Sequence, residues 1–196
     1  MGESHEQAKR LLRQRVRAIR LGLRAEEIAR CSTAVSARLL ELRLYTAARR
    51  VVAYAAVDNE VDPGGIAVAA ARAGKMVYYP RMTEDGVEFA RADPAELRPG
   101  WRGIPEPPAR EPLALPGDGV LFLVPGVAFD PRGARLGRGL GCYDRALARY
   151  PGAARVGLAY EFQVEPHLPE ATWDIRMHAI VTEARVLEGA RGPVGQ

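Results

Sequence analysis

Val51-Val52-Ala53-Tyr54-Ala55-Ala56-Val57 is a continuous apolar run that ends abruptly in Asp58-Asn59-Glu60. A run of this length and valine content is typical of a strand buried on both faces of a sheet. Polar residues directly after such a strand lie at its carboxyl end, where open parallel sheets bind their ligands. The segment therefore predicts a buried strand over 51–57 and a polar site beside Glu60.

Helical and strand-like patterns alternate on both sides of this run. Further strands are predicted at 76–79, 87–90, 120–124, 155–160 and 178–182, and helices at 63–74 and 142–150. This alternation is typical of an α/β domain with a mostly parallel central sheet. Two earlier apolar stripes at helical spacing predict core-facing helices whose positive side chains fall between the apolar ones: Leu12, Val16, Ile19 and Leu23, then Ile28, Cys31, Val35, Leu39 and Leu42.

The ends of these predicted strands carry polar residues that we expect to converge on one site. Glu60 follows the first strand, Arg81 the second, a glycine-rich segment the third, and Glu161 a later one. The carboxyl ends of parallel strands meet at one edge of the sheet, so a single ligand site is predicted there.

Length and composition indicate one ordinary globular domain. The chain has 196 residues, of which 47% are hydrophobic and 27% charged. We expect a single domain over 1–188 and a mobile tail over 189–196. The sequence has no apolar run long enough to span a bilayer and no visible secretory signal. Cys31 and Cys142 form no metal-binding pair, so a cytoplasmic protein is expected.

Basic residues are concentrated near the start of the chain. The formal net charge is +4, and seven positive side chains lie between Lys9 and Arg24. Such a segment is suited to an acidic partner, such as nucleotide phosphates, a polycarboxylate or nucleic acid. The alternative is a helix face that simply contacts water.

The segment from Val124 to Arg145 carries the clearest chemical pattern. It reads Val-Pro-Gly-Val-Ala-Phe-Asp-Pro-Arg-Gly-Ala-Arg-Leu-Gly-Arg-Gly-Leu-Gly-Cys-Tyr-Asp-Arg. Its alternating glycines allow backbone amides to approach an anion, and Arg135 and Arg138 supply donors matched to phosphate or carboxylate. Asp144 is a candidate Mg²⁺ ligand, since this ion takes one or two carboxylates beside phosphates and water. A flexible turn with helix-capping glycines is the alternative interpretation.

Two familiar phosphate-binding motifs are excluded for this segment. It has no Gly-Lys-Ser/Thr, so it is not a Walker loop. Its glycine spacing is not that of the dinucleotide fingerprint, and no acidic residue follows about 20 positions later at a strand end.

The whole pattern resembles the 5-formyltetrahydrofolate cyclo-ligase family. The long glycine-rich signature is its most specific part, and the match extends over nearly the whole chain. Lys9-Arg10-Leu11-Leu12-Arg13 resembles the family's nucleotide-contacting helix, and Glu60 matches its folate-contacting glutamate. Supporting matches are the Gly-Lys…Pro-Arg strand over 74–81 and Trp101 with its proline loop over 104–107.

The resemblance implies a three-layer α/β fold and a folate-cyclising ligase. ATP and Mg²⁺ would convert 5-formyltetrahydrofolate to 5,10-methenyltetrahydrofolate, ADP and phosphate. Arg138 and Tyr143 are the implied catalytic residues and Asp144 the metal ligand. The implied ATP contacts are Lys9, Arg10, Arg13, Arg135, Leu136, Gly137, Arg138, Gly139, Leu140, Gly141, Cys142 and Tyr143. The implied folate contacts are Ala55, Glu60, Trp101, Arg138, Gly139, Leu140, Gly141 and Cys142.

Three positions depart from the family pattern. Cys142 replaces a tyrosine, Leu140 a glycine or lysine, and His178 an aspartate assigned to the metal. Imidazole is a poor Mg²⁺ ligand, so the role is not transferred to His178, and the nearby Asp174 is an open alternative. These departures keep a second hypothesis, a folate- or nucleotide-binding member without turnover. Small-molecule partners, no nucleic acid, no membrane and a monomer or weak homodimer are expected.

Overall fold

The computed structural model describes residues 2–108, 111–114, 117–139, 141–171 and 174–189. Seven strands form the central sheet in the order β11-β10-β9-β6-β1-β2-β3. The pairs β2–β1, β1–β6, β6–β9 and β9–β10 are parallel, and the outer strands β3 and β11 are antiparallel to their neighbours. The strands are β1 (Arg50–Val52), β2 (Met76–Thr83), β3 (Gly86–Arg91), β6 (Val120–Val124), β9 (Ala154–Leu158), β10 (Ala179–Val181) and β11 (Val186–Glu188).

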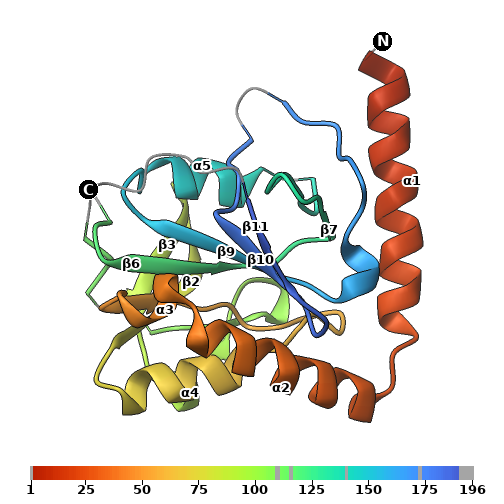
Figure 1. The fold of residues 1–196 in the computed structure, drawn as a ribbon. Helices are drawn as coiled ribbons and strands as arrows, with labels where there is room; N and C mark the ends of the chain where they lie inside the picture. Colours follow the sequence, from red (N-terminus) through yellow and green to blue (C-terminus); the bar gives the residue numbers. More distant parts are fainter. Residues whose placement is uncertain (1, 109–110, 115–116, 140, 172–173, 190–196) are drawn as a thin grey trace.

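Helices cover both faces of this sheet, which confirms the three-layer α/β fold and the mostly parallel sheet. Figure 1 shows α2, α3 and α4 on one face and α5 on the other, with α1 standing at the side. The helices are α1 (Gly2–Leu21), α2 (Ala25–Glu41), α3 (Arg43–Thr46), α4 (Gly64–Arg72) and α5 (Cys142–Ala148). None of the helices in the described part of the chain has the length and apolar character that crossing a bilayer requires.

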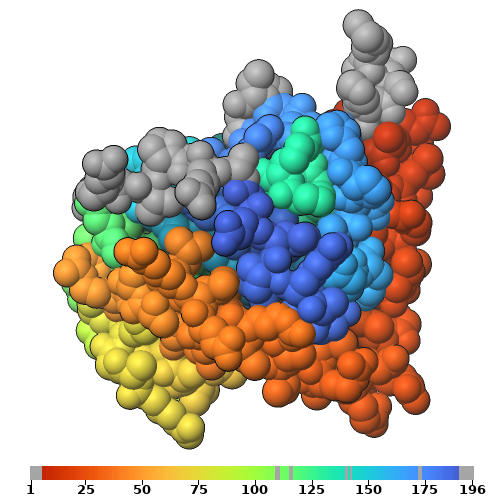
Figure 2. All heavy atoms as spheres, viewed as in Figure 1, coloured from red at the N-terminus to blue at the C-terminus, as the bar shows by residue number. Residues whose placement is uncertain are grey.

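The helix α1 lies along the side of the molecule (Figure 2). The predicted helix is confirmed, but its predicted buried stripe is partly wrong. Val16 is buried as expected, whereas Ile19 is exposed and Arg20 is buried in its place. Ile19 and Arg20 both follow Val16 at helical spacing, so the sequence pattern alone cannot choose between them. The polar partners that select Arg20 come from distant parts of the chain.

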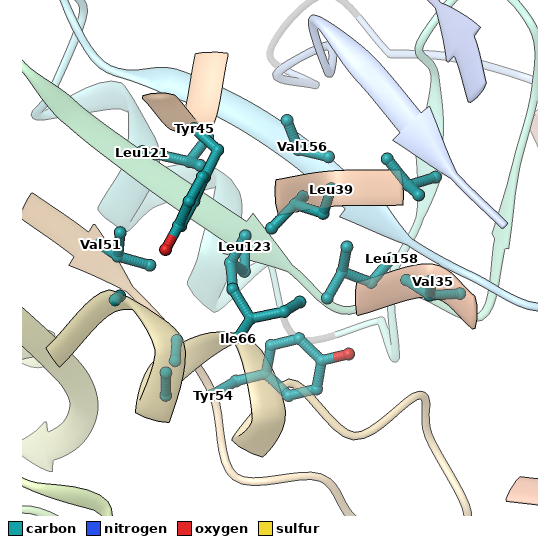
Figure 3. Close-up of a cluster of buried hydrophobic side chains, with 14 of the residues drawn as sticks. Val35, Leu39, Tyr45, Val51, Tyr54, Ile66, Leu121, Leu123, Val156 and Leu158 are labelled. Atoms are coloured by element: carbon teal, nitrogen blue, oxygen red, sulfur yellow. The ribbon is translucent and has the colours of Figure 1, made fainter. Parts of the chain in front are cut away.

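Two apolar cores lie on opposite faces of the sheet, because successive side chains of a strand point to opposite sides. On β6, Leu121 and Leu123 pack towards α2 and α4. Figure 3 shows this cluster, which also contains Val35 and Leu39 of α2 and Ile66 of α4. The alternate β6 residues contribute to the other core, beneath α5: Val120, Phe122 and Val124.

The first predicted strand is shorter than its apolar run. It ends at Val52, although the N–H of Ala53 still donates to the carbonyl of Tyr78. The chain then leaves the sheet and reaches Asp58 and Asn59, which both adopt a left-handed conformation. The remaining apolar side chains are partly or fully buried without belonging to a strand, so the run reports burial rather than strand length.

The second predicted strand is longer than expected, since β2 continues through Pro80 and Arg81 to Thr83. Pro80 cannot donate to a sheet ladder. It lies beyond the segment of β2 that pairs with β1, and it faces Phe89 of β3. The proline therefore removes no hydrogen bond from the parallel part of the sheet.

Several short elements are missing from the sequence prediction. The edge strand β11 follows β10, and β7 (Ala128–Phe129) pairs with β8 (Arg135–Leu136) inside the glycine-rich segment. The fold also contains β4 (Arg98–Pro99), β5 (Pro105–Glu106) and the 3₁₀ turns η1 (Pro94–Glu96), η2 (Trp101–Gly103) and η3 (Glu161–Gln163). The predicted tail over 189–196 falls, except for Gly189, outside the described residues.

Candidate active site at the carboxyl ends of the strands

Glu60 lies at the centre of a charged cluster next to the carboxyl end of β1. Its carboxylate is almost completely buried, and Oε1 accepts a hydrogen bond of 2.9 Å from Arg138 Nη2. A second guanidinium, that of Arg20, lies 3.7 Å from the same oxygen, and the N–H of Val57 donates to Oε2 at 3.2 Å. Glu60 is therefore held by one backbone donor and faced by two positive charges.

Arg138 connects this cluster to the glycine-rich segment. It contacts both Glu60 and, at 3.4 Å, Asp58 Oδ2, and its side chain is 45% exposed. The predicted convergence of Glu60 and the glycine-rich segment is thus confirmed. The other two strand-end residues make separate pairs, because Arg81 contacts Glu88, and Glu161 contacts Thr182 and Arg185.

Arg135 and Asp144 form a second pair beside the first. Arg135 Nη2 donates to Asp144 Oδ2 at 2.8 Å, and Nη1 donates weakly to the carbonyl of Pro125 at 3.4 Å. The Arg135 side chain is only 5% exposed, and its Nε is the buried side-chain atom that lacks a partner within the described ranges. Its guanidinium also lies 5.7 Å from the centre of the Tyr143 ring. An unused donor on a buried arginine leaves it able to bind one more acceptor.

Two tyrosines adjoin the charged cluster and stay neutral at physiological pH. Burial raises the pKa of Tyr143, and Glu60 raises it further, while Arg135 and Arg138 oppose the shift. Burial and Glu60 also hold the pKa of Tyr54 well above its ordinary value. The Tyr54 hydroxyl donates to the carbonyl of Val61 at 2.6 Å. Both phenols are therefore hydrogen-bond donors rather than bases.

Arg13 joins α1 to the glycine-rich segment. Its Nε donates to the carbonyl of Gly137 at 3.0 Å. Gly139 has φ +101°, and a Cβ there would lie 3.6 Å from the Arg13 guanidinium. Glycine adopts this backbone conformation readily, so the loop can pass beside the arginine. Arg10 and Arg13 also line a hollow of about 520 Å³ on α1, together with Glu6 and Gln7. Lys9 lies one turn after Glu6 on α1, and its Nζ is 3.9 Å from Glu6 Oε1.

The remaining predicted ligand-binding residues are placed less uniformly. Leu136 is buried in a small core with Ala128 and Leu168. Ala55 is partly buried on the way from β1 to the Asp58–Glu60 turn. Gly141 precedes α5 with φ +63°. Cys142 is the first residue of α5, but its side chain and the whole of Leu140 lie outside what the structure describes.

Trp101 lies in η2 and is not joined to the charged cluster by any described contact. The Arg102 guanidinium lies 4.3 Å from the centre of the Trp101 ring, and the backbone N–H of Trp101 donates to Glu106 Oε1 at 3.1 Å. The indole is 40% exposed. The predicted folate contact of Trp101 therefore stays a prediction.

The predicted metal ligand Asp144 offers an ion one carboxylate. Within the described part of the chain, no three His, Cys, Asp or Glu side chains are grouped to hold a metal. Asp144 Oδ2 is paired with Arg135, while Oδ1 accepts only a weak 3.4 Å bond from the N–H of Ile175. This donor set fits an Mg²⁺ that takes its other ligands from phosphates and water, and it does not fit a fully protein-bound ion.

Asp174 and His178, the other two residues considered for the metal, each have a described partner of their own. Asp174 Oδ2 accepts the N–H of Ala171 at 2.7 Å. His178 Nδ1 accepts the N–H of Arg155 at 3.0 Å, and burial lowers its pKa, followed by the charge of Arg155. His178 is therefore a neutral side chain that fixes the start of β9.

Three polar residues around the site were not predicted from the sequence. Arg20 contacts Glu60, and Asn59 contacts the end of α1. Gln163 Nε2 donates to the carbonyls of Gly126 and Val127 at 2.9 and 2.8 Å, which fixes the chain after β6. Only Arg20 left a sequence signal, since it follows Val16 at core-facing spacing.

Comparisons with known proteins agree with this geometry. Residues 5–183 match the model of the 5-formyltetrahydrofolate cyclo-ligase family. The 5-formyltetrahydrofolate cyclo-ligase of Escherichia coli is 33% identical over 91% of this chain and 100% of that protein, and the one of Haemophilus influenzae is 30% identical over 89% and 97%. The structure of Aquifex aeolicus 5,10-methenyltetrahydrofolate synthetase matches with a TM-score of 0.82 and 35% identity, over 96% of each chain.

Proposed function

Because the chain belongs to the 5-formyltetrahydrofolate cyclo-ligase family, we propose that the cluster around Glu60 and Arg138 is its active site. The activity of the chain is the conversion of 5-formyltetrahydrofolate to 5,10-methenyltetrahydrofolate, since its relatives over nearly their whole length carry that name. What is proposed here is how its own residues perform the reaction.

The direct contact between Glu60 and Arg138 is the observation that carries the proposal. Glu60 follows β1 and Arg138 belongs to the glycine-rich segment, 78 positions later. Glu60 would bind the pterin, whose amino and ring N–H groups are donors that a carboxylate accepts. Arg138 would bind the phosphoryl group, for which a guanidinium is matched in charge and shape. The contact between Glu60 and Arg138 therefore joins the proposed pterin site to the proposed phosphoryl site.

ATP is the proposed co-substrate, with its phosphates between α1 and the glycine-rich segment. Arg13 contacts Gly137, and Arg10 and Arg13 line the hollow on α1, so cations and loop backbone face the same region. Arg135 adds a buried guanidinium with an unused Nε donor. Phosphoryl transfer depends on positioning and on neutralising charge, and this arrangement supplies both.

The reaction has two bond exchanges. The formyl oxygen attacks the γ-phosphorus, so that an O–P bond forms and the bond to ADP breaks. The neighbouring anilino nitrogen then attacks the formyl carbon, loses its proton, and phosphate leaves with the oxygen. Arg138 and the neutral phenol of Tyr143 would stabilise the transferred group as donors, because charge develops on its oxygens.

Mg²⁺ is the proposed metal, and Asp144 is the residue that would hold it. The ion supplies neutralisation of phosphate charge when it is bound. Asp144 also keeps Arg135 in place, which is a separate role that needs no metal.

The test is a near-ultraviolet absorbance assay of purified protein with 5-formyltetrahydrofolate, following the methenyl product. Product growth that requires ATP and Mg²⁺ is expected, with ADP release that requires folate. Controls omit ATP, Mg²⁺ or folate in turn. If both ligands bind but no product forms, the chain is a binding protein with the family fold; if neither binds, the proposed site is wrong.

A further inference from the structure

Arg20 is a charged side chain at a position where the sequence pattern favours an apolar one. Its side chain is 2% exposed, on the face of α1 that also carries the buried Val16. Burial lowers the pKa of Arg20, and the nearby Glu60 opposes that shift. A charge that is removed from water needs hydrogen-bonding or charged partners in return. The partners of Arg20 therefore show what its burial achieves.

Those partners all lie at the carboxyl ends of two neighbouring strands. Arg20 Nε donates to the carbonyl of Asp58 at 2.7 Å, and Nη1 donates to the carbonyl of Gly126 at 3.4 Å. The same Nη1 lies 3.7 Å from Glu60 Oε1. One guanidinium thus fixes the turn after β1, the chain after β6 and the carboxylate between them.

The turn after β1 holds α1 in return. Asn59 Nδ2 donates to the carbonyls of Arg20, Leu21 and Leu23, at 3.1, 3.4 and 3.4 Å. Asp58 and Asn59 have φ values of +52° and +56°. Residues other than glycine adopt this left-handed conformation at a cost in free energy. The last turn of α1 therefore binds this turn through both the Arg20 side chain and its backbone carbonyls.

The two arginines at Glu60 differ in exposure, and this difference separates their roles. Arg138 is 45% exposed, so a ligand can displace it from the carboxylate, whereas Arg20 is enclosed. We propose that Arg20 is a positioning residue, which holds Glu60 and the turn over 57–60 in the one geometry that binds the pterin. The inference rests on the proposed function, because it takes Glu60 to be the pterin contact.

The experiment measures KM for 5-formyltetrahydrofolate, KM for ATP and kcat in Arg20→Met, Arg20→Lys and the control Arg17→Met. Arg20→Met is expected to raise the folate KM by about 10-fold or more, as misplacement of a binding group does, with the ATP KM changed by less than about twofold. Arg20→Lys keeps the charge but not the planar guanidinium, so its folate KM should lie between those of Arg20→Met and the native protein. Arg17 lies on the same helix, and its Nη2 is 3.4 Å from Asp58 Oδ2, but its side chain is exposed. An exposed ion pair contributes little, so Arg17→Met should match the native protein.

A merely structural role for Arg20 would reduce the fraction of active protein and leave both KM values unchanged, and that result would overturn the proposal. If Arg20→Met does not fold, Arg20→Lys carries the test, and an unchanged folate KM in it has the same meaning. Glu60→Gln separates the two hypotheses. A normal folate KM in Glu60→Gln contradicts the proposed site itself. A raised one, with normal values in the Arg20 variants, contradicts only the role of Arg20.

The double variant Arg20→Met with Glu60→Gln gives an independent measurement. If Arg20 acts through Glu60, its substitution should change the folate KM by less than about twofold once Glu60 is already replaced, because the two residues share one contact. Additive effects of the two substitutions would show that Arg20 acts elsewhere.

Discussion

At the scale of single residues, the two carboxylate oxygens of Asp144 have different partners. Oδ2 accepts a hydrogen bond from Arg135, whereas Oδ1 accepts a weak one from the N–H of Ile175 and is the proposed ligand of Mg²⁺. Asp144→Asn should raise the Mg²⁺ concentration for half-maximal rate by about 10-fold or more, since an amide is a weaker ligand than a carboxylate for this hard cation. The measurement is a titration of initial rate against Mg²⁺ at constant free ATP.

Asp174→Asn is the matched control for this titration. Its carboxylate accepts the N–H of Ala171, and it should leave the Mg²⁺ dependence unchanged. An unshifted curve in Asp144→Asn, with a raised KM for ATP, would leave Asp144 with only the positioning of Arg135. A shift in Asp174→Asn alone would transfer the metal role to that residue.

Tyr143 leads to a prediction about pH. Burial and Glu60 disfavour the phenolate and raise the pKa, so the hydroxyl keeps its proton at and above pH 10. Tyr143→Phe should lower kcat by about 10²-fold, the typical loss of one preorganised donor. The shape of the pH–rate profile below pH 10 should be the same in the variant as in the native protein. A log kcat profile from pH 6 to 10 for both proteins tests this. An alkaline limb below pH 10 that is present in the native protein and absent in Tyr143→Phe would show that the Tyr143 hydroxyl loses its proton in this range, against the prediction.

Individual site residues differed in how far the sequence could predict them. Arg135, Arg138 and Asp144 were predicted from the glycine-rich segment and Glu60 from its position after the first strand, and the structure places them in two adjacent ion pairs. Arg20 could not be assigned, because its partners are separated from it by between 38 and 106 positions in the sequence. The spacing on a helix reports which face is buried, but not which polar partners lie there.

At the scale of elements, the turn over 57–60 determines how α1 meets the sheet. Asn59 is left-handed and donates to three carbonyls at the end of α1. Asn59→Ala should reduce the free energy of unfolding by about 2 kcal/mol, since it loses those bonds and keeps the conformational cost. Asn59→Gly loses the same bonds but removes that cost, so its loss should be about 1 kcal/mol. Urea denaturation of the three proteins measures the order.

Equal losses in the two Asn59 variants would mean that the left-handed conformation costs nothing here. A loss in neither would mean that the bonds to α1 are replaced by water. Either result would show which of the two contributes to stability, the conformation of the turn or its hydrogen bonds to α1.

The predicted elements were reliable where the pattern was long and buried. The strand at 120–124 agrees with β6 residue for residue, and the second helix agrees with α2 within a few positions. The strand at 51–57 was too long, because apolar residues pack equally well in a buried connection. β11 and the β7–β8 hairpin were missed, because strands of two or three residues carry no periodicity.

At the scale of the whole molecule, stability should fall in acid in two steps. Burial lowers the pKa of His178, and so does the charge of Arg155. The unfolded chain therefore binds a proton below about pH 6.5 that the folded chain does not bind, and stability is lost as pH falls below that value. Burial alone would raise the pKa of Asp130, but the Arg132 side chain and three backbone N–H donors lower it overall. Its contribution is lost below about pH 4.

Urea midpoints between pH 7.5 and 5 test the first step, with His178→Gln as the comparison. A glutamine oxygen can accept the N–H of Arg155 but does not titrate, so the variant should have a flatter profile over this range. If the two profiles are parallel, His178 does not control the acid stability of the fold.

The helix α1 has a consequence for how the chain acquires activity during synthesis. It is translated before the sheet, yet Arg13, Arg15 and Arg20 contact Gly137, Glu165 and Gly126 respectively. A ribosome-bound chain that lacks these later residues can offer the helix only part of its final surface, the turn that contains Asp58 and Asn59. Catalysis must therefore switch on late in translation, and incomplete chains should be inert whatever fraction of the sheet they have formed. The helix α1 therefore reaches its full set of contacts only after β6 and β9 have been made.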